Sequence, residues 1–145
     1  MDNITETIDI NKKLEICPCC GRKIVIYQHR FNHLLMYDLL CLDKAGGTST
    51  LGKLKIRFAM TPSEYNNFQK LAYFGLVKKE NRSYVITELG RNFLKGTQGC
   101  PSYVKTRIND VVDRGPEVSY EDAMVAFQNR KQYESQVARL KEIIA

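Results

Sequence analysis

The sequence predicts an α+β fold in which short helices and β-hairpins share one core. Three observations predict it: apolar residues recur at both the helix and the strand period, helix-capping signals precede several segments, and polar turn residues join pairs of short strands. The chain has 145 residues, of which 43% are hydrophobic, and this size suits one domain with its own core.

The chain begins with an acidic tail and a cysteine-rich turn. Residues 1–16 carry four acidic side chains against two lysines. Cys17 and Cys20 then form a CxxC pair that a glycine follows. The alternating Ile24 and Ile26 predict a short strand after this thiol knuckle.

A buried helix and a basic strand are expected next. Residues 31–42 are apolar on nearly every side, so we expect a helix over residues 28–44. The Gly, Thr and Ser residues at 46–50 predict a loop. Apolar and basic residues then alternate over 53–58, which predicts a strand with one basic face. Its apolar side is Leu54, Ile56 and Phe58, and its basic side is Lys53, Lys55 and Arg57.

The strongest helix-start signal of the chain lies at Thr61. Thr61 can serve as N-cap, Pro62 suits the first helical position, and Glu64 can close a capping box. We therefore expect an amphipathic helix over residues 62–73. Its polar face would carry Ser63, Asn66, Asn67 and Lys70.

A charged hairpin and another capped helix follow. Residues 76–79 and 83–86 have strand character, and the residues 80–82 between them include no apolar side chain, which predicts a β-hairpin with a charged tip. Thr87 is a suitable N-cap for the next helix, which Gly96 would end.

The last third predicts an extra hairpin and two helices. Residues 103–108 turn at Asn109-Asp110 into a second strand, and Ser119 caps a helix over residues 120–127. A terminal amphipathic helix follows, and because its apolar stripe is short we expect it to dock on the chain's own core rather than pair two chains. This stripe is Tyr133, Val137, Leu140 and Ile144.

The order helix, basic strand, capped helix, charged hairpin and helix predicts a winged helix-turn-helix. An N-terminal CxxC knuckle, an extra β-hairpin and C-terminal helices would complete the fold. We expect an acidic tail over residues 1–16, a winged-helix domain with its thiol or zinc knuckle over residues 17–128, and an amphipathic helix over residues 129–145.

Charge placement points toward double-stranded DNA as a partner. Residues 52–96 hold nine Lys or Arg against three Glu, so this third of the chain accounts for the whole net charge of +6. A localised basic block is typical of proteins that bind phosphate backbones, although it also occurs as an ordinary solvated face. We expect groove contacts from Ser63, Asn66, Asn67 and Lys70, and phosphate contacts from Lys78, Lys79 and Arg82.

Two resemblances extend this interpretation. NNFQKLAYFGLVKK and YVITELGRNFLKG, within residues 61–96, resemble the recognition helix and wing of MarR-type winged-helix regulators. Over residues 15–127 the chain is similar to small uncharacterised proteins of bacteriophages and prophages, although Cys100 departs from their usual pattern. The phage-type resemblance implies the fold and a phage-like origin, and its members have no assigned activity. Together with the charge placement, we expect a phage-type transcriptional regulator.

The cysteines allow a structural zinc site. Cys17 and Cys20 have the spacing of one ligand pair, and His29 and His33 would share a helix face as the second pair. Free thiols or a vestigial knuckle are the alternative. Five cysteines, three of them crowded into four positions, do not suit paired disulfides, so we expect reduced thiols and a cytoplasmic location.

Other function classes find less support in the sequence. We see no phosphate-binding glycine loop, no catalytic motif, no membrane-length apolar run and no signal-peptide segment, so we expect a non-catalytic, cytoplasmic protein. The alternative to DNA binding is a phage-encoded protein-interaction module that engages a host or phage machine. We expect a monomer or a weak homodimer.

Overall fold

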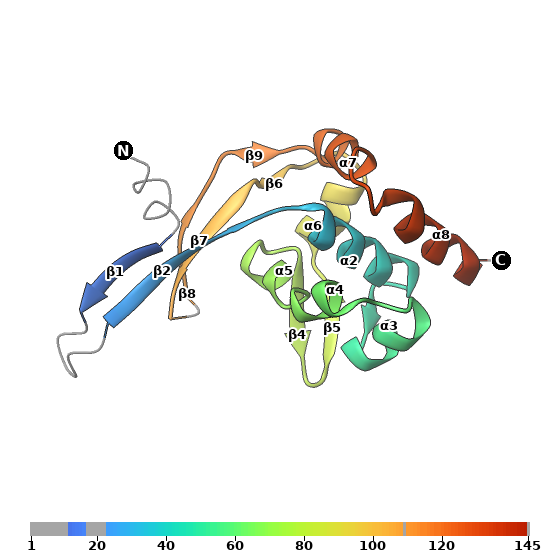
Figure 1. The fold of residues 1–145 in the computed structure, drawn as a ribbon, viewed down its shortest axis with the longest axis horizontal. Helices are drawn as coiled ribbons and strands as arrows, with labels where there is room; N and C mark the ends of the chain where they lie inside the picture. The colour runs from blue at the N-terminus through green and yellow to red at the C-terminus, as the bar shows by residue number, and fades with distance from the viewer. Residues whose placement is uncertain (1–11, 17–22, 109, 145) are drawn as a thin grey trace.

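The computed structural model describes residues 12–16, 23–108 and 110–144, and it has the mixed helix and sheet content expected of an α+β fold. Figure 1 shows a helical body from which a four-stranded sheet extends to one side. The described residues therefore form two parts, the helices with a small sheet and the strands of the larger sheet. One hydrophobic core includes residues of both parts, among them Val104 of the larger sheet.

The helical body holds a small three-stranded sheet in the order β3-β5-β4. Strands β4 and β5 form the predicted charged hairpin, and the loop predicted before residue 51 contains β3. The elements of the helical body are α2 (His33–Lys44), β3 (Thr48–Ser49), α3 (Leu51–Arg57), α4 (Pro62–Asn66), α5 (Lys70–Tyr73), β4 (Val77–Glu80), β5 (Ser83–Ile86) and α6 (Glu88–Leu94).

The start predicted for the first helix, at residue 28, is wrong. Strand β2 (Lys23–Arg30) continues to Arg30, because its residues pair with another strand as far as that position. Helix α2 begins only at His33, where the Asn32 carboxamide oxygen accepts hydrogen bonds from the backbone N–H groups of Leu34 and Leu35. An Asn cap of this kind satisfies N–H groups that the helix itself leaves unpaired.

The basic strand predicted over residues 53–58 is helix α3. The Thr50 hydroxyl accepts the N–H of Lys53 and caps this helix. Leu54 and Phe58, four residues apart, are 0% and 1% exposed, whereas Ile56 between them is 87% exposed. A strand would place all three on one face, so the burial follows the helix period instead.

The helix predicted over residues 62–73 is two short helices, α4 and α5, with a turn between them. The capping box at Thr61 and Glu64 is present as predicted. Beyond it, the backbone forms tighter i→i+3 hydrogen bonds, including one of 3.0 Å from Lys70 N–H to the Asn67 carbonyl. The Asn67 carboxamide donates at 2.6 Å to the Ser63 carbonyl, which a regular helix would use for a backbone bond.

The larger sheet has the antiparallel order β1-β2-β7-β8. Strands β7 and β8 form the predicted extra hairpin, whereas β1 lies in the segment predicted to be an acidic tail. The two-residue strands β6 and β9 pair with each other, and β9 leads into helix α7. The bounds are β1 (Lys12–Ile16), β6 (Cys100–Pro101), β7 (Tyr103–Arg107), β8 (Asp110–Arg114), β9 (Glu117–Val118) and α7 (Tyr120–Gln128).

The terminal helix α8 (Tyr133–Ile144) docks on the body, as expected from its apolar stripe. Leu140 is buried, and the Tyr133 ring packs edge-on against Phe127 of α7 with 5.1 Å between ring centroids. One polar contact adds to this packing: Arg139 of α8 forms an ion pair of 2.7 Å with Glu64 of α4. Helix α8 therefore contacts α4, the element that carries Ser63 and Asn66, two of the residues predicted to contact DNA.

Candidate nucleic-acid interface

Helix α3 presents cations to solvent in place of the predicted basic strand. Lys53, Lys55 and Arg57 are all exposed. The Lys55 ammonium lies 4.0 Å from the centroid of the Tyr65 ring, which holds one end of α3 against α4 through a cation–π contact. The cations predicted to lie on one face of a strand therefore lie on a helix, and Lys55 contacts α4 through Tyr65.

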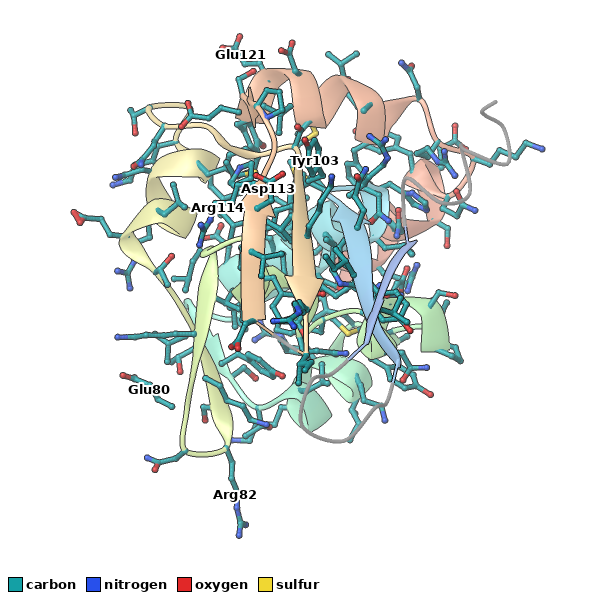
Figure 2. All side chains as sticks on the ribbon, turned by 90° about the vertical axis from the view of Figure 1, so that its left-hand side faces the viewer. Glu80, Arg82, Tyr103, Asp113, Arg114 and Glu121 are labelled. Atoms are coloured by element: carbon teal, nitrogen blue, oxygen red, sulfur yellow. The ribbon has the colours of Figure 1, made fainter. Side chains whose placement is uncertain are left out.

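The hairpin of β4 and β5 supplies the second group of cations. Lys78, Lys79 and Arg82 are exposed, as the predicted wing requires. Lys78 forms an ion pair of 3.2 Å with Glu80, and Lys79 lies 5.5 Å from the Tyr84 ring centroid. Arg82 projects from the hairpin tip into solvent, far from Tyr103 and Asp113 of the larger sheet (Figure 2).

The predicted polar face of the 62–73 segment divides into two. Ser63 and Asn66 are exposed together with Gln69, a third polar side chain that the sequence interpretation missed. Asn67 and Lys70 are only partly exposed and line a cleft against β2. Where the backbone forms i→i+3 hydrogen bonds, side chains three residues apart lie above one another. Ser63, Asn66 and Gln69 therefore form one row, and Asn67 and Lys70 form another.

The cleft lies where β2 meets the start of α2 and the α4–α5 turn. Its volume is about 300 Å³. The described residues that line it are polar or basic apart from one leucine, and none of them is acidic. They are Gln28, His29, Arg30, Asn32, Leu35, Asn67 and Lys70.

Glu64 adds no acid to the exposed surface. The side chain is buried and receives two bonds from the Arg139 guanidinium, at 2.7 and 2.9 Å, and one of 2.9 Å from the Gln136 carboxamide. Burial pushes the pKa of Glu64 upward, but the bonds from Arg139, Thr61 and Gln136 outweigh it and hold the pKa below its ordinary value. Glu64 is therefore a charged anchor inside the molecule.

The two candidate zinc ligands that the structure describes do not share a helix face, so this part of the prediction is wrong. His29 is on β2, and its Nε2 lies 3.0 Å from the Thr106 hydroxyl; His33 is the first residue of α2. Cys17 and Cys20 lie outside the described residues. Among residues 12–16, 23–108 and 110–144 no three potential ligands cluster, and the zinc site stays a prediction.

The two described cysteines are core residues. Cys41 on α2 is fully buried, as expected for a small apolar side chain, and Cys100 is fully buried on β6. Burial raises the pKa of the Cys100 thiol to about 12, and the carboxylate of Glu117 acts in the same direction. Both thiols are thus held in their protonated, unreactive form.

No helix in the described part of the chain is long and apolar enough to cross a membrane.

Comparison with known proteins adds no relative to these observations. No family model, curated protein or solved structure matches the chain.

Proposed function

We propose that this protein is a winged-helix protein that binds double-stranded DNA and acts as a non-catalytic transcriptional regulator. The element order supports this fold: α2, β3, α3, the α4–α5 pair and the β4–β5 hairpin follow one another, and the small sheet has the order β3-β5-β4. A tri-helical unit followed by a hairpin is the arrangement in which winged helices dock on DNA.

The observation that carries the proposal is the imbalance of exposed charge over residues 51–86. Of the two acids in this segment, Glu64 is buried against Arg139, which leaves Glu80 as the exposed acid. Six exposed cations face solvent in the same segment, giving an exposed charge of 6 − 1 = +5. They are Lys53, Lys55, Arg57, Lys78, Lys79 and Arg82.

Each part of this surface has a distinct role in the proposal. The cations of α3 and of the hairpin bind phosphates and set the position of the protein on the duplex. Ser63, Asn66 and Gln69 lie between these two groups in sequence and contact base edges in the major groove, where amides read adenine. The buried Glu64–Arg139 pair holds the start of α4 in place.

A salt-dependent binding assay tests the proposal. Random duplex DNA is titrated at several salt concentrations, first with the unmodified chain and then with the triple variant Lys78→Glu, Lys79→Glu, Arg82→Glu. Each phosphate contact removed should lower the slope of log affinity against log salt by about 0.9. The matched control reverses three exposed cations outside the surface: Lys95→Glu, Arg130→Glu and Lys131→Glu.

The control triple changes the net charge equally, so it should keep the slope near that of the unmodified chain. An equal loss in both triples would mean that only net charge matters and would remove the hairpin from the interface. If the unmodified chain binds no duplex more tightly than about 10⁻⁴ M at physiological salt, the DNA proposal fails.

A protein-interaction module is the second candidate, and one observation favours it. Ile56, 87% exposed, stands on α3 in the middle of the basic surface, where DNA phosphates would offer it no apolar contact. Replacing Ile56 with Ser separates the two functions. Unchanged DNA affinity fits the first candidate, and loss of a protein partner fits the second.

A further inference from the structure

The cleft beside α5 has the properties of a small-ligand site. Its volume of about 300 Å³ falls at the low end of the range of roughly 300–1,000 Å³ for such sites. That size suits one compact ligand. The walls come from three elements, β2, the start of α2 and the α4–α5 turn.

The charge in the cleft favours an anion. Arg30 and Lys70 both line it, and none of the described residues that line it is Asp or Glu. The field of Lys70 is felt by its neighbour His29: burial lowers the pKa of His29, and the positive charge of Lys70 lowers it further. Asn32, in the same wall, caps the N-terminus of α2, a helix of twelve residues that adds its positive dipole end.

The polar walls are already held in position. Asn32 is fixed by its cap bonds to α2, Asn67 by its bond of 2.6 Å to the Ser63 carbonyl, and His29 by Thr106. The His29 ring also stacks on Tyr73 with 5.4 Å between ring centroids. A site whose groups are ordered before binding loses less entropy when the ligand arrives.

These fixed side chains keep hydrogen-bonding capacity for a ligand. Asn32 uses its carboxamide oxygen as a cap and retains two N–H donors, whereas Asn67 uses its amide nitrogen and retains an acceptor oxygen. Donors and acceptors therefore stand next to two cations.

We propose that this cleft binds one nucleotide, with the phosphate between Arg30 and Lys70 and the base or sugar against the carboxamides of Asn32 and Asn67. Arg presents a planar fork to phosphate oxygens, and Lys adds a compact charge. The choice of a nucleotide among phosphate-bearing ligands rests on the proposed function. Binding itself needs only the cleft, which lies apart from the exposed Ser63, Asn66 and Gln69.

Calorimetric titration of the full chain tests the proposal with three probes: dAMP, inorganic phosphate and a short oligodeoxyadenylate. We expect dAMP to bind more tightly than inorganic phosphate, because only dAMP reaches the carboxamides. A strand that binds more tightly than dAMP identifies single-stranded nucleic acid as the source of the nucleotide. A strand that binds more weakly identifies the free nucleotide.

Two single variants locate the site. Lys70→Gln and Arg30→Gln each remove one charged contact and should weaken dAMP binding roughly tenfold. The exposed Lys131→Gln is the control of equal charge and should leave dAMP affinity unchanged. Thermal unfolding of each variant checks that the fold is retained, and Asn67→Ala offers a second route to the same site without changing charge.

Several results would overturn the inference. Absence of dAMP binding at millimolar concentration, equal binding of phosphate and dAMP, or dAMP affinity unaffected by both Lys70→Gln and Arg30→Gln would each remove it. The triple hairpin variant separates this test from that of duplex binding. It should lose duplex affinity and keep dAMP affinity, so either function can fail while the other stands.

Discussion

Two buried carboxylates, close enough to influence each other's ionisation, lie in opposite surroundings. Glu64 on α4 is 2% exposed, and both of its oxygens accept hydrogen bonds, including the Arg139 fork. Asp38 on α2 is 0% exposed, and neither of its oxygens has a hydrogen-bond partner among the residues that the structure describes. The pKa of Glu64 lies below its ordinary value, whereas burial, with the charge of Glu64 added, raises the pKa of Asp38 well above it.

The difference shows that a partner, more than depth, decides whether a buried acid stays charged. An unpaired buried charge is costly, and burial therefore raises the pKa of Asp38 and favours its neutral form, whereas the guanidinium of Arg139 favours the ionised form of Glu64. The ion pair of Glu64 and Arg139 joins α8 to α4. Arg139 also donates a hydrogen bond of 3.0 Å to the Ala59 carbonyl, just before α4. Helix α4, which carries the proposed base contacts, is therefore anchored from the C-terminal helix.

The largest effect should come from removing the cation. Arg139→Met leaves Glu64 buried and unpaired, and it should lower the free energy of unfolding by about 3 kcal/mol, the cost expected when one partner of a buried ion pair is lost. Urea unfolding at neutral pH measures it. Arg130→Met, at an exposed position outside the pair, is the control and should change stability by less than about 0.5 kcal/mol.

A double variant sharpens the same prediction. Glu64→Gln in the Arg139→Met background removes the orphaned charge and should restore much of the lost stability. No recovery would mean that Arg139 contributes through packing over the Tyr37 ring, whose centroid lies 4.9 Å from it, and not through the charge of Glu64.

The second-largest expected effect is a gain in stability and comes from replacing Asp38. Asp38→Asn should raise the free energy of unfolding at pH 7 by on the order of 1 kcal/mol, because the amide is neutral at every pH, whereas the carboxyl of Asp38 is neutral on burial only at a free-energy cost. A raised folded pKa contributes stability that is present below the unfolded pKa and is lost as pH rises through the folded pKa. The stability gain of Asp38→Asn should thus grow as pH increases.

The pH profile distinguishes the two acids. Glu64 has a depressed pKa, so its contribution is present above its unfolded pKa and is lost as pH falls through the folded pKa. Unfolding measured from acid to neutral pH should show loss at the acid end in both the unmodified chain and Asp38→Asn. A gain from Asp38→Asn that is the same at every pH would show that Asp38 is not neutralised on folding.

Local signals explain the parts of the fold that the sequence predicted correctly. The caps at Thr61, Thr87 and Ser119 are present because N-capping depends on a few neighbouring residues. The alternation at Leu54, Ile56 and Phe58 was ambiguous, because a spacing of four also fits a helix. Only the burial of Leu54 and Phe58 against the core, a tertiary property, decides between the two.

The sequence predicted only those parts of the candidate site whose residues are neighbours in the chain. The exposed cations of the hairpin follow from strand alternation around a short turn. The cleft brings Gln28 and Asn32 beside Asn67 and Lys70, and the anchor pairs Glu64 with Arg139 across 75 positions of sequence. No period or spacing encodes such pairings, which arise when packed elements meet.

The smallest expected change in the free energy of unfolding concerns Gln136, whose carboxamide has one satisfied end and one unsatisfied end. Its amide nitrogen donates at 2.9 Å to Glu64, whereas its carboxamide oxygen is buried without a hydrogen-bond partner in the described part of the chain. Gln136→Met removes a bond to a charged group, worth about 1.5–3 kcal/mol, and also an unsatisfied acceptor that costs about 1–3 kcal/mol. The two changes oppose each other, so urea unfolding should show a net change below about 1 kcal/mol.

Gln136→Glu, which keeps the shape but places a second anion against Glu64, should be clearly destabilising at neutral pH, and its stability should recover as the pH is lowered. A large loss in Gln136→Met would mean that the bond to Glu64 outweighs the unpaired oxygen, and that Arg139 alone does not hold the carboxylate.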